Sequence, residues 1–295
     1  MKAIILVILL LSIPLISIAS QQINNRGEKI VESINVKYYS EGKIHKPYSY
    51  KFDFKYNQKN EIIQVTKSYE YNASPYQDGF ELKKGLEIYN IKRKENGLIN
   101  TVDYIAFSNG KQLPIKKEYT FDYDGKLLEM QNVSIGECKT EYKFDYEGTI
   151  LRKYKERCSF IKETYLNYYY IVELEWNSNL SKYVCTMNPE KKEDEVVCRQ
   201  TNQFIYSQYI QDTNININNL LVIGELHDIE ELTFGFLGRK SSHFILNSET
   251  YKRSPFSHLD NEFELDKDGN IYKIIQKKKD GSVVTFQVLE IVYKN

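Results

Sequence analysis

The sequence predicts an all-β fold, an antiparallel meander curled into a barrel-like or porin-like shell, on three observations. A hairpin phrase recurs along the chain, apolar and polar residues alternate over long stretches, and turn signals follow one another closely. Turns at such short intervals leave little room for crossover helices, so neighbouring strands are expected to pair antiparallel.

The hairpin phrase has two aromatic or apolar residues two positions apart, then an Asp, a Gly three positions later, and an apolar residue two positions after that. It occurs at 119–127, 142–150 and 263–271, and a stretched copy spans 50–62. Residues two apart share one face of a strand. Asp favours opening a turn, and Gly accepts the positive φ that the turn requires. Each copy therefore predicts two strands joined by a tight turn.

Alternation is longest at 166–176, where six apolar residues would share one face: Leu166, Tyr168, Tyr170, Val172, Leu174 and Trp176. Such a face most often packs against the interior of a sheet protein. An aromatic stripe can instead line a sugar or lipid pocket, so that alternative stays open. In the last strand the apolar positions change parity between Val288 and Leu289, which predicts a β-bulge.

One stretch interrupts the strand pattern. Residues 216–241 carry apolar side chains at irregular spacing, and Asp228, Glu230 and Glu231 precede an apolar run. Acidic residues in a first helical turn are favoured by the helix dipole. We therefore expect a short helical insertion near 216–240.

The first 19 residues have the composition of a secretory signal peptide. Lys2 is followed by an apolar run to Ile18, and Ser17 and Ala19 are small residues that suit cleavage after Ala19. The run is shorter than the roughly 20 residues that a spanning helix needs. We expect a signal peptide at 1–19, a flexible segment at 20–34, and a single β-rich domain at 35–295. The mature protein would be periplasmic or secreted, with no lipid-accepting Cys near the cut.

Four cysteines fit an oxidising compartment. Cys138 and Cys158 lie symmetrically about Gly148, the turn glycine of a hairpin phrase, so they are expected to face each other across that hairpin. Cys185 and Cys198 flank a polar stretch in the same manner. We predict disulfides Cys138–Cys158 and Cys185–Cys198 among the three connectivities that four cysteines allow. A zinc site is the alternative, but the sequence has no C-x-x-C spacing.

Charge and motifs indicate no enzyme class. Forty basic residues balance forty acidic ones, which gives no electrostatic case for nucleic acid. The four histidines lack metal-site spacing, although His227–Asp228 and His258-x-Asp260 are adjacent pairs. The stretch from Asp266 resembles the front half of a calcium loop but has Lys277 at the twelfth position. We assign no catalytic, cofactor-binding or metal-binding residue.

Residues 205–295 combine three features in order: an Asn-rich entry at 214–221, the stretch ELTFGFLGRKSSHFI, and the terminal hairpin from Phe263 to Tyr293. Together they resemble a family of secreted domains of unknown function with a porin-like fold, found in Bacteroides-type bacteria. The resemblance implies tyrosine-rich strands coiled into a barrel-like shell and carries no catalytic residues. The upstream hairpin phrases are also similar to the YD repeats of large secreted shells.

These observations favour a non-enzymatic exported protein that binds a small molecule, a glycan or a protein partner at an unidentified site. The first alternative is an integral outer-membrane β-barrel, since barrel strands also alternate apolar and polar residues. The second is a hydrolase of envelope material or polysaccharide, because acidic residues are plentiful. A peripheral association with the outer membrane also stays open.

Overall fold

The computed structural model describes residues 28–40, 42–44, 49–72, 82–133, 138–160, 168–187, 199–222, 229–251, 257–279 and 283–294. The expected signal peptide lies outside these residues. Within the described part, eighteen strands belong to one sheet. Their bounds are β1 (Val31–Ser40), β2 (Lys43–Ile44), β3 (Tyr50–Tyr56), β4 (Ile62–Asn72), β5 (Leu82–Arg93), β6 (Ile99–Ser108), β7 (Lys111–Gln112), β8 (Lys116–Phe121), β9 (Leu127–Val133), β10 (Cys138–Glu147), β11 (Ile150–Phe160), β12 (Tyr168–Trp176), β13 (Leu180–Met187), β14 (Arg199–Ile210), β15 (His243–Tyr251), β16 (Ser257–Leu265), β17 (Ile271–Lys279) and β18 (Val283–Tyr293).

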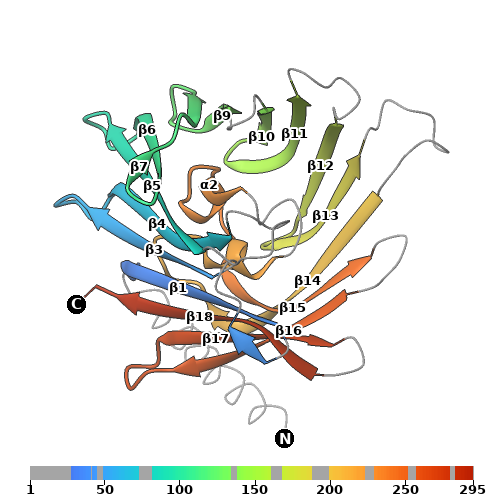
Figure 1. Cartoon of the computed structure of the whole chain (residues 1–295). Helices are drawn as coiled ribbons and strands as arrows, with labels where there is room; N and C mark the ends of the chain where they lie inside the picture. The colour runs from blue at the N-terminus through green and yellow to red at the C-terminus, as the bar shows by residue number, and fades with distance from the viewer. Residues whose placement is uncertain are drawn as a thin grey trace, which may run out of the picture.

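The strands form an antiparallel meander that curls back on itself, which confirms the predicted fold class (Figure 1). Most strands pair with their neighbours in sequence, and β18 returns to pair with β1, so the first and last long strands lie side by side. The sheet is not closed, because no ladder joins β6 to β8 within the described residues. The described strands thus form a barrel-like shell with a seam between β6 and β8.

The hairpin phrases form the predicted turns. The copies at 119–127, 142–150 and 263–271 become the β8–β9, β10–β11 and β16–β17 hairpins. Their glycines, Gly125, Gly148 and Gly269, all have positive φ. In the last of these turns, the Asp266 carboxylate accepts the backbone N–H groups of residues 268 and 270. That aspartate therefore stabilises the turn of an ordinary hairpin.

The structure adds a feature that the sequence analysis missed: the same β-bulge follows six of the turns. In each hairpin the ladder skips one residue near the start of the returning strand. The skipped residues are Ile63, Asn100, Leu128, Arg152, Ser181 and Tyr272. A bulge bends its strand and increases the local twist. Six similar bulges therefore help to curl the sheet into a shell.

Alternating side chains divide into an inner and an outer face. On β12, Val172 and Leu174 are buried on the inner face, as the 166–176 pattern predicts for its described part. β18 does contain a bulge, but the ladder skips Phe286, whereas Val288 and Leu289, where the parity changes in the sequence, pair in regular register. β1 begins at Val31, so residues 31–34 of the segment expected to be flexible belong to a strand. They are held there because the side chains of Val31 and Ile34 are fully buried in the core.

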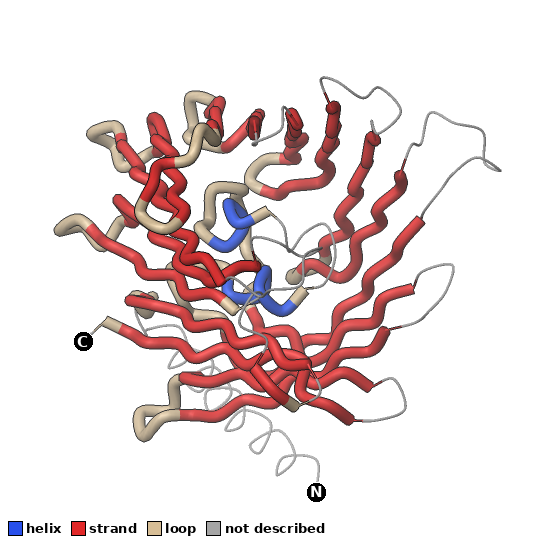
Figure 2. The backbone as a smooth tube through the Cα atoms, in the orientation of Figure 1, coloured by secondary structure: helices blue, strands red, loops and turns tan. Residues whose placement is uncertain are grey.

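The predicted helical insertion is also confirmed. A 3-10 helix, η5 (Ile217–Leu221), and a short α-helix, α2 (Glu230–Thr233), lie between β14 and β15. Both lie inside the curve of the sheet (Figure 2). No described helix is long and apolar enough to cross a membrane.

The cysteine geometry differs from the expectation in one respect. Because the bulge shifts the β10–β11 register, Cys138 lies opposite Phe160 and Cys158 opposite Thr140. The two cysteines are therefore diagonal neighbours on one face, and the expectation that they face each other directly is wrong. Cys158 and Cys185 are buried. The Cys138 side chain and Cys198 lie outside what the structure describes, so both disulfides stay predictions.

Candidate functional site

The shell encloses a segment of its own chain, which we call the internal segment and define as the described residues from 211 to 242. It includes η5, all five residues of which are buried, and α2. Asn219 ties the two helices together, since its side-chain amide donates hydrogen bonds to Ile229 O and to Thr233 Oγ1. The internal segment thus fills space that an open barrel would leave to solvent.

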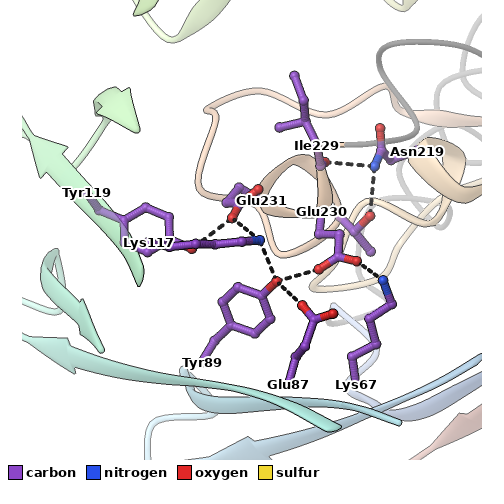
Figure 3. Close-up of polar contacts among 10 residues, drawn as sticks. Lys67, Glu87, Tyr89, Lys117, Tyr119, Asn219, Ile229, Glu230 and Glu231 are labelled. Carbon is purple, nitrogen blue, oxygen red and sulfur yellow. Dashed lines mark hydrogen bonds and ion pairs between the residues drawn. The ribbon is translucent and has the colours of Figure 1, made fainter. Parts of the chain in front are cut away.

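The two acidic residues of α2 contact the wall through charged groups (Figure 3). The Glu230 carboxylate pairs with Lys67 Nζ of β4 and accepts a hydrogen bond of 2.5 Å from the Tyr89 hydroxyl of β5. Glu231 Oε1 accepts a hydrogen bond of 2.9 Å from the Tyr119 hydroxyl of β8 and lies 3.6 Å from Lys117 Nζ. These contacts define the ion-pair network.

Tyrosine rings surround both lysines. Lys117 Nζ lies 5.0 Å from the centroid of the Tyr89 ring and 4.8 Å from that of Tyr104. Lys67 Nζ lies 5.1 Å from the Tyr50 ring centroid. Ring faces attract cations at such distances. The side chain of Lys117 is 12% exposed and that of Glu231 only 1%, so these charges depend on one another rather than on water.

The network keeps its groups in definite protonation states. Burial alone would raise the pKa of Glu230, but the charges of Lys67 and Lys117 outweigh it and lower this pKa to about 2. Burial would lower the pKa of Lys67, yet the charges of Glu230 and Glu87 raise it above its ordinary value. Burial, reinforced by nearby carboxylates, raises the pKa of the Tyr89 and Tyr119 hydroxyls. Near neutral pH the Glu230–Lys67 pair is therefore charged and the two tyrosine hydroxyls remain donors.

The opposite side of the internal segment is held by neutral amides. Gln276 Nε2 of β17 donates to Leu221 O, and Gln287 Nε2 of β18 donates to Leu220 O. Gln287 also donates to Gln276 Oε1. The glutamines thus supply donors to the carbonyls at the end of η5, which has no later helical turn to satisfy them.

The residues that the sequence analysis weighed as sites are not brought together. Trp176 faces inward and donates from Nε1 to Leu151 O at 2.9 Å, so it packs the interior. His258 Nε2 lies 2.8 Å from Asp260 on β16, on the face opposite the buried Leu259. His45, His227 and Asp228 lie outside the described residues. Among the described side chains no group of three or more His, Cys, Asp or Glu is placed to hold a metal ion.

A groove of about 770 Å³ lies on the wall formed by β1 and β3–β6. One row of its lining crosses five strands in direct register: Asn35, Lys51, Ser68, Leu86 and Phe107. These positions alternate with the inward-facing ones on the same strands, so the row belongs to the outer face. A smaller pocket of about 320 Å³ is lined by the internal segment itself, and a cavity between Trp176 and the internal segment has a volume of about 30 Å³.

Two crystal structures share this fold. A porin-like protein from Bacteroides uniformis matches with a TM-score of 0.59 at 12% identity, over 90% of this chain and 98% of that one. A porin-like protein from Bacteroides vulgatus matches with a TM-score of 0.53 at 9% identity, over 90% and 99% of the two chains. No protein-family model matches the sequence, and no curated protein does. The chain therefore has a porin-like fold, and the likeness extends well beyond residues 205–295.

Proposed function

We propose that this protein is an exported, non-enzymatic binding protein that takes a small ligand in the groove on its outer wall. One observation carries the proposal: the interior is occupied by the internal segment, whereas a groove of about 770 Å³ lies on the wall of β1 and β3–β6. A volume of this size suits a small-molecule ligand. The predicted signal peptide supports export.

The outer wall supports an aqueous location. Cross-strand ion pairs lie along it, each with a partner at least partly exposed to solvent. They are Lys37–Glu290, Lys143–Glu129, Lys153–Glu173 and Lys277–Glu262. An integral barrel presents an apolar band to lipid, where charged side chains cost about 2–4 kcal/mol each. This distribution favours the exported protein over the outer-membrane alternative.

The buried carboxylates give little support to the hydrolase alternative. Both oxygens of Glu230 have partners, Lys67 and Tyr89, and Glu231 has Tyr119 and Lys117. A glycosidase needs two carboxylates that flank an open substrate site. This buried acidic pair is instead engaged in holding the internal segment.

The lining of the groove favours an uncharged molecule with hydroxyl groups and an apolar face, the class that includes short glycans. Leu86, Ile88 and Phe107 supply apolar surface, whereas Asn35 and Ser68 supply hydrogen-bonding groups. Lysines and a glutamate in the lining put both signs of charge on the groove, which gives no preference for a strongly charged ligand.

The test uses the mature protein, a panel of neutral oligosaccharides, and native mass spectrometry of any co-purifying molecule. We expect binding of a glycan and at least a tenfold loss of affinity, about 1.4 kcal/mol, in Phe107→Ala. Tyr272→Ala is the matched control, since Tyr272 is 40% exposed and does not line the groove. Equal binding by Phe107→Ala and wild type, or no bound small molecule at all, would refute the proposal. Turnover of a glycan would favour the hydrolase.

A further inference from the structure

The seam between β6 and β8 is the place where the wall lacks a ladder. β6 pairs with β5 along its length and with β7 only at Phe107 and Ser108. β8 pairs with β9. β6 and β8 lie in contact, yet no ladder pairing between them occurs in the described residues. Unpaired strand edges expose backbone groups, so something else must hold these two strands together.

The carboxylates of α2 reach to opposite sides of this seam. Glu230 contacts Lys67 and Tyr89, which belong to β4 and β5 on one side. Glu231, the next residue, contacts Lys117 and Tyr119 of β8 on the other side. Lys117 itself spans the seam, since its Nζ donates to the Tyr89 hydroxyl at 2.9 Å.

Two phenylalanines of the internal segment also contact opposite sides of the seam. The Phe234 ring packs edge-on against Phe52 of β3 and Tyr89 of β5, at centroid distances of 5.5 and 5.1 Å. The Phe236 ring packs edge-on against Phe121 of β8 at 6.3 Å. The carbonyl of Phe236 also accepts the backbone N–H of Leu127, at the start of β9. Glu230 and Phe234 therefore contact the β3–β5 side of the seam, and Glu231 and Phe236 contact the β8–β9 side.

We propose that residues 229–237 form an internal clasp that takes the place of the missing β6–β8 ladder and makes the seam a lateral gate in the wall. While the clasp is engaged, both halves of the wall are tied to one rigid segment. When the Glu231 contacts are lost, β8 and β9 separate from β6, while β1 and β14–β18 stay closed by their continuous ladders. This inference does not depend on the ligand groove.

Hydrogen–deuterium exchange of the full mature protein tests the clasp. In Glu231→Gln we expect backbone amides of β6, β8 and β9 to exchange about tenfold faster, because the charged acceptor that ties α2 to β8 is lost. Amides of β16–β18 should exchange at the wild-type rate. Glu173→Gln, which breaks an exposed ion pair on the outer wall, is the control and should change neither region.

Two results would overturn the inference. One is unchanged exchange in β6 and β8; the other is faster exchange of the same size in β16–β18, which would make the internal segment a general support of the core. If Glu231→Gln does not fold, Tyr119→Phe gives the same test more gently, because it removes only the hydrogen bond from Tyr119 to Glu231. The faster exchange should again be confined to β6, β8 and β9.

Discussion

The internal segment is anchored by charges on one side and by neutral amides on the other. Toward β17 and β18 the wall is a continuous ladder, and Gln276 and Gln287 bind the backbone of η5. Toward the seam, Lys67 and Lys117 bind the carboxylates of α2. Amide hydrogen bonds weaken steeply with misalignment, whereas charge attraction falls off only gradually with distance. The directional bonds thus occur in the part of the wall farthest from the seam, and the longer-range attraction occurs on strands that lie on either side of the seam.

The two kinds of anchor also differ in what their loss leaves behind. Removing a glutamine leaves a neutral carbonyl without its donor. Removing one partner of a buried ion pair leaves a charge without compensation, which costs more. The ion-pair side should therefore be the more sensitive of the two.

Lys67→Met should have the largest effect. Methionine keeps the apolar stem beside the Tyr50 and Tyr69 rings but removes the ammonium that pairs with Glu230. Breaking a buried ion pair in this manner costs about 3–5 kcal/mol. Urea denaturation followed by circular dichroism measures the change in the free energy of unfolding.

The matched control is Lys153→Met on the outer wall. Lys153 Nζ lies 3.3 Å from Glu173, and the two side chains are 32% and 64% exposed. An exposed pair contributes about 0–1 kcal/mol. Equal losses of unfolding free energy in the two variants would show that the seam side of the interior is as well hydrated as the outer wall. That result would contradict the expected difference between the buried and the exposed ion pair.

Local signals predict the hairpins because turn residues act within a few positions. Asp122, Asp266 and their glycines determine turns that the structure confirms. The shared bulge was missed, although it leaves a trace: buried residues on the returning strand are spaced by three, as at Leu127 and Met130 or Ile271 and Ile274. One such bulge also moved Cys158 out of direct register with Cys138. A strictly alternating pattern cannot represent this shift.

The ion-pair network could not be predicted from local pattern, because Lys67 and Glu230 are 163 residues apart. The sequence does show polar residues at strand positions that face the interior. Lys67 occupies the same face of β4 as the buried Val65, and Gln287 the same face of β18 as the buried Leu289. A polar residue at an apolar position of a strand indicates an interior partner, but not which one. The acids of α2 were explained by the helix dipole alone, which missed their partners on the wall.

Acid should weaken the charged side of the segment selectively. The pKa of Glu230 is lowered from 4.5 to about 2 in the folded protein, so its contribution is complete above pH 4.5 and is lost as the pH falls toward 2. The difference in unfolding free energy between wild type and Glu230→Gln should therefore shrink across that range. Urea titrations at several pH values measure it. A difference that stays constant down to pH 2 would show that the Glu230 carboxylate is not held by the lysines.

Gln287→Leu should have the smallest of these effects. Leucine is apolar and similar in size, but it leaves the buried carbonyl of Leu220 and Gln276 Oε1 without the donor that Gln287 supplies. The expected loss is about 1–3 kcal/mol in the free energy of unfolding, measured by urea denaturation. Because an amide does not titrate, this loss should be the same at pH 7 and at pH 3, in contrast to that of Glu230→Gln. A loss equal to that of Lys67→Met would mean that the amides hold the internal segment as strongly as the charges do. The kind of anchor would then not follow from how close the adjoining strands lie to the seam.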